Sequence, residues 1–143
     1  MNKKDWVWMP HAGHFILGHL CRFRLTTYVG GYVVSTVGEY LPGAQERELL
    51  AESKGIKLKG KGDERVADYI KKIGFEEISC DGKYETMVFK AERSENKCCP
   101  FVASDWCGVD MERYNEPGEA CKGHLKMCEK WSRKGKGRKG VKR

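Results

Sequence analysis

Two runs of strand-forming residues meet at a Gly-Gly pair, and this feature limits the possible folds more than any other. The runs are Cys21–Val29 and residues 32–37, separated only by Gly30 and Gly31. Glycine tolerates the positive φ angles of a two-residue hairpin turn, so the runs are predicted to pair antiparallel. Residue types alternate along the first run, which predicts one buried and one wetter face. Because an isolated hairpin is only marginally stable in water, further strands or a helix must cover it.

The remaining pattern predicts one α+β domain over residues 1–132, with an antiparallel sheet of two hairpins packed by two or three helices. A chain of 143 residues is long enough for one core. Trp6 and Trp8 are assigned to a short N-terminal strand, and Asp63 is expected to cap the second helix. The first helix is expected to turn Leu49 and Leu50 inward. The predicted elements are a short strand within residues 1–10 that ends at Pro10, a short strand at 15–17, helices at 44–54, 63–73 and 117–132, and a second hairpin from 75–79 to 83–91 that turns at Asp81-Gly82.

Positive charge is concentrated at the C-terminal end. From Lys130 onward the chain has eight Lys or Arg residues and no acidic residue, whereas residues 1–129 have 19 basic and 20 acidic residues. The body is therefore not a basic nucleic-acid domain, and residues 133–143 are predicted to form a disordered basic tail. No apolar run is long enough to span a membrane, and no signal peptide is readable, so the cytoplasm is the expected location.

The clearest candidate metal ligands lie between residues 98 and 128. A zinc ion in a structural site usually has four Cys or His ligands. On a helix, His124 and Cys128 would lie one turn apart, and upstream cysteines would complete the set. The alternative is a cysteine-rich helix face packed on the sheet. The candidate zinc ligands, which would support the C-terminal segment, are Cys98, Cys99, Cys107, Cys121, His124 and Cys128.

A second candidate metal site precedes the first hairpin. His11, His14 and Cys21 lie close together in sequence, with His19 between them, but these residues lack an evident partner pair nearby. They form either half of a site that the C-terminal cysteines complete, or an ordinary loop in which His11 and His14 make hydrogen bonds.

An enzyme is the third hypothesis. Ser35, Thr36 and Glu39 lie at the end of the second strand. Glu39 beside His11 and His14 would give a hydrolytic metal site with an open coordination position. Strand hydroxyls more often simply favour β-structure, and no order of nucleophile, base and orienting residue is readable, so no catalytic residue is assigned.

The basic tail is the candidate nucleic-acid contact. Lys and Arg residues bind phosphates without needing a fold, and Trp131 would offer an aromatic surface for stacking. The alternative is a solubilising tail with Trp131 anchoring the last helix. The residues assigned to this contact are Arg133, Lys134, Lys136, Arg138 and Lys139.

Several stretches resemble a family of small, uncharacterised proteins encoded by tailed bacteriophages. The matching stretches are PHAGHF at 10–15, CRF at 21–23, TYVGGYVVSTVGEYLP at 27–42, IGFEEI at 73–78, YETMVF at 84–89, CCPF at 98–101 and GHLKMCEKW at 123–131. The resemblance implies a setting, the bacterial host cytoplasm during infection, and no specific activity. Small phage proteins in that setting often bind a host enzyme or defence complex and block it.

Three functions follow as expectations. The first is a zinc-stabilised protein that binds and inhibits or redirects a host or defence protein complex. The second is a nucleic-acid-binding accessory protein that uses the basic tail. The third is a metal-dependent hydrolase.

Overall fold

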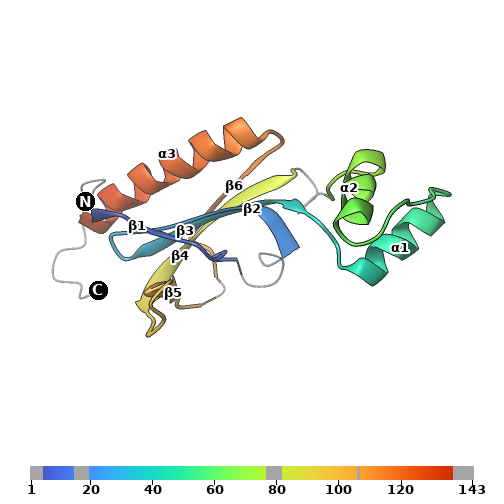
Figure 1. Ribbon diagram of the computed structural model, residues 1–143. Coiled ribbons are helices and arrows are strands. Elements are labelled where there is room, and N and C mark those ends of the chain that lie inside the picture. Colours follow the sequence, from blue (N-terminus) through green and yellow to red (C-terminus); the bar gives the residue numbers. More distant parts are fainter. Residues whose placement is uncertain (1–4, 15–19, 77–81, 106, 137–143) are drawn as a thin grey trace.

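The computed structural model describes residues 5–14, 20–76, 82–105 and 107–136, which form a six-stranded sheet and three helices. The predicted α+β class is confirmed, and Figure 1 shows one long helix lying along the sheet. The strands are β1 Val7–Met9, β2 Cys21–Val29, β3 Tyr32–Tyr40, β4 Tyr84–Arg93, β5 Phe101–Ala103 and β6 Asp110–Tyr114. The helices are α1 Ala44–Ser53, α2 Asp63–Lys72 and α3 Pro117–Lys136.

The predicted hairpin forms the centre of the sheet. Val29 pairs with Tyr32 across the turn. Gly30 and Gly31 have φ angles of 55° and 98°. Positive φ at both turn positions is what a two-residue hairpin of this kind requires, and it explains why glycine occupies both. Strand β3 continues beyond the predicted end at residue 37 as far as Tyr40.

The predicted second hairpin is wrong in its pairing. Strand β4 does form, but it pairs antiparallel with β3 on one side and with β6 and β5 on the other. Of the expected partner strand, Glu76 makes one bridge to Tyr40. Residues 77–81, with the Asp81-Gly82 turn, lie largely outside the described part of the chain, as do residues 15–19. Strands β5 and β6 lie in a segment for which no strand was predicted, because neither short sequence alternates clearly.

Helix α3 covers one face of the sheet. Met127 and Cys128 of the helix pack with Val34 of β3, Val88 of β4 and Trp6 ahead of β1. The helix extends beyond residue 132 to Lys136, so residues 133–136 are helical and not part of a disordered tail. Residues 137–143, which include Arg138 and Lys139, lie outside the described residues.

The opposite face is covered by the segment around β1 and by the loop that leads into β5. Met9, Tyr28, Val33 and Cys99 form a buried cluster there. The last four residues of β2 are therefore buried irrespective of which face they occupy. The expectation of one wetter face fails in this half of the strand, because the alternation in sequence does not reveal that both faces are covered.

Helices α1 and α2 lie beyond one end of the sheet (Figure 1). Ala51, Leu58 and Tyr69 form their own small apolar cluster. Gly62, rather than the predicted Asp63, occupies the position that caps α2. Leu49 points outward and is 66% exposed, contrary to the expected inward position.

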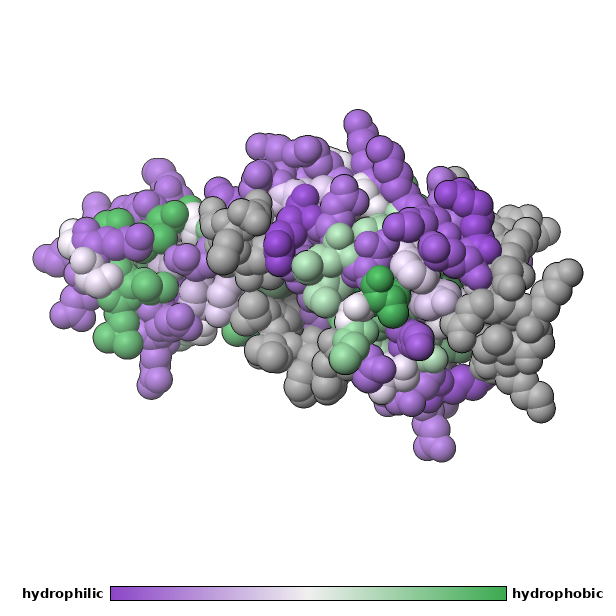
Figure 2. Space-filling model, turned by 180° about the vertical axis from the view of Figure 1, so that it is seen from behind, coloured by the Kyte–Doolittle hydropathy of each residue, from purple (hydrophilic) through white to green (hydrophobic). Residues whose placement is uncertain are grey.

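We refer to α1, α2 and the loop between them as the helical lobe. Hydrophilic side chains cover most of the face shown in Figure 2, while hydrophobic side chains gather over the helical lobe and over part of the sheet. None of the helices in the described ranges has the length and apolar character needed to cross a lipid bilayer.

Candidate metal centre

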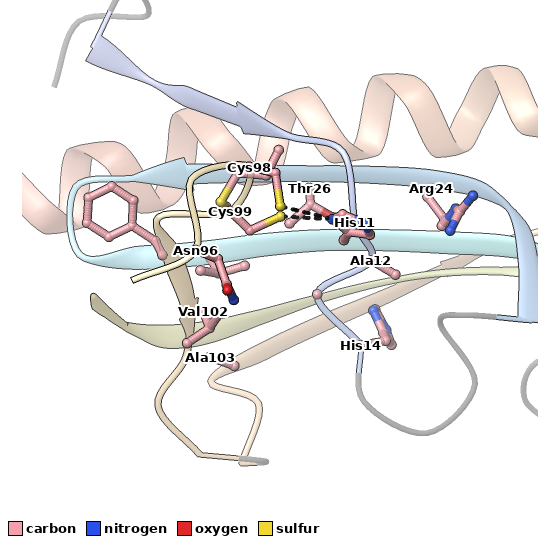
Figure 3. A pocket seen from close by; sticks show the side chains of 14 residues that line it. His11, Ala12, His14, Arg24, Thr26, Asn96, Cys98, Cys99, Val102 and Ala103 are labelled. Atoms are coloured by element: carbon pink, nitrogen blue, oxygen red, sulfur yellow. Dashed lines mark hydrogen bonds between the residues drawn. The ribbon is translucent and has the colours of Figure 1, made fainter. Parts of the chain in front are cut away.

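One histidine and two adjacent cysteines meet on the face of the sheet opposite α3 (Figure 3). His11 follows β1, whereas Cys98 and Cys99 lie in the loop between β4 and β5. The His11 Nδ1 atom lies 3.3 Å from Cys99 Sγ and 3.6 Å from Cys98 Sγ. All three candidate ligand atoms lie within 4.8 Å of one another, so this group can hold a metal ion.

These separations match the edges of a metal coordination polyhedron. Zinc binds imidazole nitrogen at about 2.0–2.1 Å and thiolate sulfur at about 2.3 Å, usually with tetrahedral angles. Two such ligands on one ion lie about 3.6 Å apart, by the geometry of those bond lengths. Small movements of the side chains are therefore enough to place His11, Cys98 and Cys99 around one ion.

Pairing between β4 and β5 positions the two cysteines. Ala91 pairs with Ala103 and Arg93 with Phe101, which closes the loop of residues 94–100. The Ser94 amide also donates to the Pro100 carbonyl at 2.7 Å. Phe101 stacks on Tyr28 with ring centroids 3.6 Å apart, which holds the loop against β2. The loop is thus attached on both sides of Cys98 and Cys99.

Ser35 of β3 anchors the other half of the group. The Gly13 amide donates to Ser35 Oγ at 3.0 Å, and a Cβ atom on Gly13 would lie only 2.8 Å from Ser35 Cβ. Glycine at this position therefore lets the backbone lie close against the sheet, two residues after His11.

His14 extends the anchor into a chain of hydrogen bonds. Its Nδ1 lies 2.8 Å from Ser35 Oγ, and its Nε2 lies 3.2 Å from Glu85 Oε1. Arg113 Nε donates to Glu85 Oε2 at 3.3 Å. All of these hydrogen bonds can form at once. The Gly13 N–H then donates to Ser35 Oγ, the Ser35 hydroxyl donates to His14 Nδ1, and the His14 Nε2–H donates to Glu85. The bond from His14 lowers the pKa of Glu85.

Ser35, His14 and Glu85 have the residue types of a hydrolytic triad, but the serine is buried. Ser35 has no exposed surface. Its oxygen is also already bound by the Gly13 amide. A nucleophile must reach a substrate carbonyl, so this arrangement serves to hold the chain segment in place rather than to attack a substrate.

A cavity of about 650 Å³ lies beside the metal-binding group. Its lining contains the three candidate ligands and four further polar side chains, His14, Arg24, Thr26 and Asn96 (Figure 3). No carboxylate is among the described residues that line it. Cys98 is exposed, whereas Cys99 is buried and its pKa is raised by that burial. The cavity leaves room for one further metal ligand but supplies no acidic general base.

His124 and Cys128 lie in the core between α3 and the sheet and not beside Cys98. His124 Nε2 lies 2.9 Å from Thr27 Oγ1, and its Nδ1 lies 2.7 Å from Thr36 Oγ1. Burial lowers the pKa of His124 to about 4 and raises that of Cys128 to about 12. The described metal-binding group contains neither residue. The alternative of a helix face packed on the sheet therefore describes both.

The other predicted site residues are dispersed. Cys107 and Cys121 are exposed, and the structure does not bring either into the metal-binding group. Cys21 is buried, which raises its pKa to about 11, and it pairs with Tyr40 across the hairpin. Glu39 accepts a hydrogen bond from Tyr84 Oη at 3.0 Å and does not join His11. His19 lies outside the described residues.

The observed group combines His11 from the N-terminal set of candidate ligands with Cys98 and Cys99 from the C-terminal set. The sequence left open that the N-terminal histidines form half of a site completed by C-terminal cysteines, and the structure places His11 beside two of those cysteines. The expected partners of Cys98 and Cys99 on the last helix lie elsewhere, because nothing in the spacing reveals that the 94–100 loop folds back towards the segment after β1. The usable signal was the adjacent pair Cys98-Cys99 itself.

Comparisons with models of protein families, with curated proteins and with solved structures find no match for this chain.

Proposed function

We propose that the chain is a zinc-binding protein in which the ion joins the segment after β1 to the loop between β4 and β5. The observation that supports this proposal is the position of His11 Nδ1, 3.3 Å from one thiol sulfur and 3.6 Å from the next. The zinc then stabilises this face of the domain, which is a different role from holding the C-terminal helix.

The ligand types favour zinc over harder cations. Thiolates and imidazole select zinc and other soft or borderline metals, whereas calcium and magnesium prefer oxygen ligands. The group supplies three ligands, and tetrahedral zinc takes four. The three candidate ligands line the neighbouring cavity, so water or a side chain from outside the group would have room to supply the fourth ligand.

Binding is a better-supported role for this protein than hydrolysis. A zinc hydrolase needs a general base near its open position, and no carboxylate is among the described residues that line the cavity. His14 also lines it, but both of its ring nitrogens are already bound, to Ser35 and to Glu85. Ser35, the hydroxyl bound to His14, is fully buried. We therefore propose a zinc-stabilised binding protein whose partner is a protein complex, in the setting that the phage resemblance suggests: a host or defence complex in an infected bacterium.

The metal proposal is tested by the zinc content of the purified chain. Cys98→Ser/Cys99→Ser and His11→Ala should bind less than wild type, which should bind one zinc ion per chain. Cys121→Ser is the matched control, because Cys121 is exposed and lies outside the group. A wild-type chain without stoichiometric zinc, or a double variant that retains it, contradicts the proposal.

The binding proposal is tested by affinity capture from a bacterial lysate. Wild type and Cys121→Ser should retain the same specific protein complex, and Cys98→Ser/Cys99→Ser should lose it. Purified complex should then bind the wild-type chain in a direct assay. Equal capture by all three chains, or no specific capture by wild type, argues against a zinc-dependent binding role.

A further inference from the structure

Four lysines form a row along the exposed side of α3. Lys122, Lys126, Lys130 and Lys134 follow one another at intervals of four residues, and all four are exposed. Residues four apart on a helix lie on the same ridge. With a rise of about 1.5 Å per residue, the row extends about 18 Å along the helix. We refer to these four residues as the lysine row.

The lysine row lies in the region that carries the chain's positive charge. Residues 1–116 have 17 basic and 18 acidic residues, whereas residues 117–143 have ten basic and two acidic residues. The net charge of +7 therefore comes from α3 and the residues after it. This separation places a near-neutral body behind a strongly basic helix.

The buried face of α3 leaves the lysine row available to a partner. Met127 and Cys128 point into the core, and Figure 1 shows no other element on the outer side of the helix. Towards β6, Lys130 Nζ lies 2.7 Å from Asp110 Oδ2, which fixes one member of the row. Lys130 and Lys134 also place their ammonium groups 5.8 Å and 5.2 Å from the centre of the Trp131 ring.

We infer that the lysine row binds the phosphate backbone of a nucleic acid. A regularly spaced series of cations suits a linear polyanion, since about 18 Å covers roughly five base-pair steps of 3.4 Å along one strand. Binding of this kind depends on release of counterions and does not read sequence. The inference goes beyond the zinc proposal, because the metal centre lies on the opposite face of the sheet.

An anionic membrane is the less favoured partner. A helix that lies in a bilayer surface needs an apolar face that inserts into the lipid, and the apolar face of α3 is occupied by the sheet. An acidic protein surface would match the charge but lacks the regular repeat of charges that evenly spaced lysines suit. Both remain as outcomes of the test.

The experiment measures the affinity of the full chain and its variants for a labelled oligonucleotide. The oligonucleotide is tested both single-stranded and as a duplex, across about 50–200 mM salt. Lys122→Glu/Lys126→Glu should bind at least tenfold more weakly than wild type. Lys122→Ala/Lys126→Ala should lower the slope of log K against log salt by about one unit for each lysine. Lys122→Arg/Lys126→Arg should bind as wild type does. Lys57→Glu/Lys61→Glu, with the same change of charge on the helical lobe, should lose much less affinity.

Three outcomes overturn the inference. The first is equal affinity of Lys122→Glu/Lys126→Glu and Lys57→Glu/Lys61→Glu, which would show only a general charge effect. The second is no binding by wild type at the lowest salt. The third is binding of vesicles that contain anionic lipid, or of an acidic polypeptide, without binding of nucleic acid. Because the metal centre is separate, Cys98→Ser/Cys99→Ser should retain the affinity for nucleic acid.

Discussion

Cys99 Sγ lies 3.3 Å from Nδ1 of His11, although 88 positions separate the two residues in the chain. The contact joins the segment after β1 to the loop between β4 and β5. The strand before His11 and the strand after the cysteine loop are both short, because β1 and β5 each have three residues. A metal ion at this point would therefore add a connection between two parts of the chain that are otherwise joined by stacking and hydrogen bonds to the sheet.

Removal of zinc should lower the stability of the wild-type chain. A ligand that binds only the folded state adds about 2.7 kcal/mol when its free concentration is 100 times Kd. Thermal unfolding in the presence of a chelator should therefore begin at a lower temperature than in its absence. Cys98→Ser/Cys99→Ser should show no such difference. A chelator effect of the same size in both chains would place the metal elsewhere.

Gly13→Ala should weaken zinc binding without removing a ligand. The added methyl group would lie 2.8 Å from Ser35 Cβ, so the backbone must move away from the sheet and carry His11 with it. A zinc titration should show a higher Kd than in wild type. Gly118→Ala is the control, because a Cβ atom there meets nothing within 4 Å. Equal zinc affinity of the two variants would contradict the anchoring role of Gly13.

His124→Gln should destabilise the fold but leave the zinc content unchanged. The imidazole bridges Thr27 and Thr36 in the core, and loss of such buried hydrogen bonds costs roughly 1–3 kcal/mol. The loss should appear as a lower midpoint in urea unfolding. A loss of bound zinc in this variant would instead indicate that His124 is a zinc ligand.

The wild-type chain should lose stability between about pH 6.5 and pH 4 because of His124. Its pKa is about 4 in the folded state, so only the unfolded state takes up a proton in that range. The unfolded state is then favoured as the pH falls, by roughly 3 kcal/mol at most. Urea unfolding at several pH values should show this decline, and His124→Gln should show less of it.

Glu85→Gln should remove a second loss of stability on acidification, which occurs at lower pH than the loss caused by His124. The pKa of Glu85 is lowered by the hydrogen bond from His14, so its contribution to stability is present above the ordinary value of about 4.3 and is lost as the pH falls below it. The variant should be roughly 1–3 kcal/mol less stable at neutral pH. Glu48→Gln should cost much less, because the Glu48–Arg65 pair is exposed and screened by solvent. Similar losses of stability in both variants would show that the hydrogen bonds among Ser35, His14 and Glu85 contribute no more than the exposed ion pair.

The parts of the fold that were predictable are those with local signals. The Gly30-Gly31 turn, the helices at α1 and α2 and the start of α3 all carry such signals within a few residues. Strands β5 and β6 were not predictable, because they exist only through pairing with β4. A three-residue strand contains too few positions to show a period.

The candidate site was predictable in its residue types but not in its grouping. His11, Cys98 and Cys99 were all candidate ligands, and the correct set depends on how the 94–100 loop folds over the sheet. His124 was misleading for a physical reason: a histidine one helical turn from a cysteine is equally suited to bridge two buried threonines. Only the position of Thr27 and Thr36 opposite the helix distinguishes the two roles.

The helical lobe is an insertion between two neighbouring strands, so this part of the chain can be shortened or lengthened without disturbing the sheet. Gly38 near the end of β3 pairs with Tyr84 at the start of β4, so the two strands are neighbours, and the whole lobe is inserted between them. Because the lobe packs around its own cluster of Ala51, Leu58 and Tyr69, the register of the sheet does not depend on it. A short turn in its place would leave every described strand pairing intact, which makes this junction the natural place to exchange one inserted module for another.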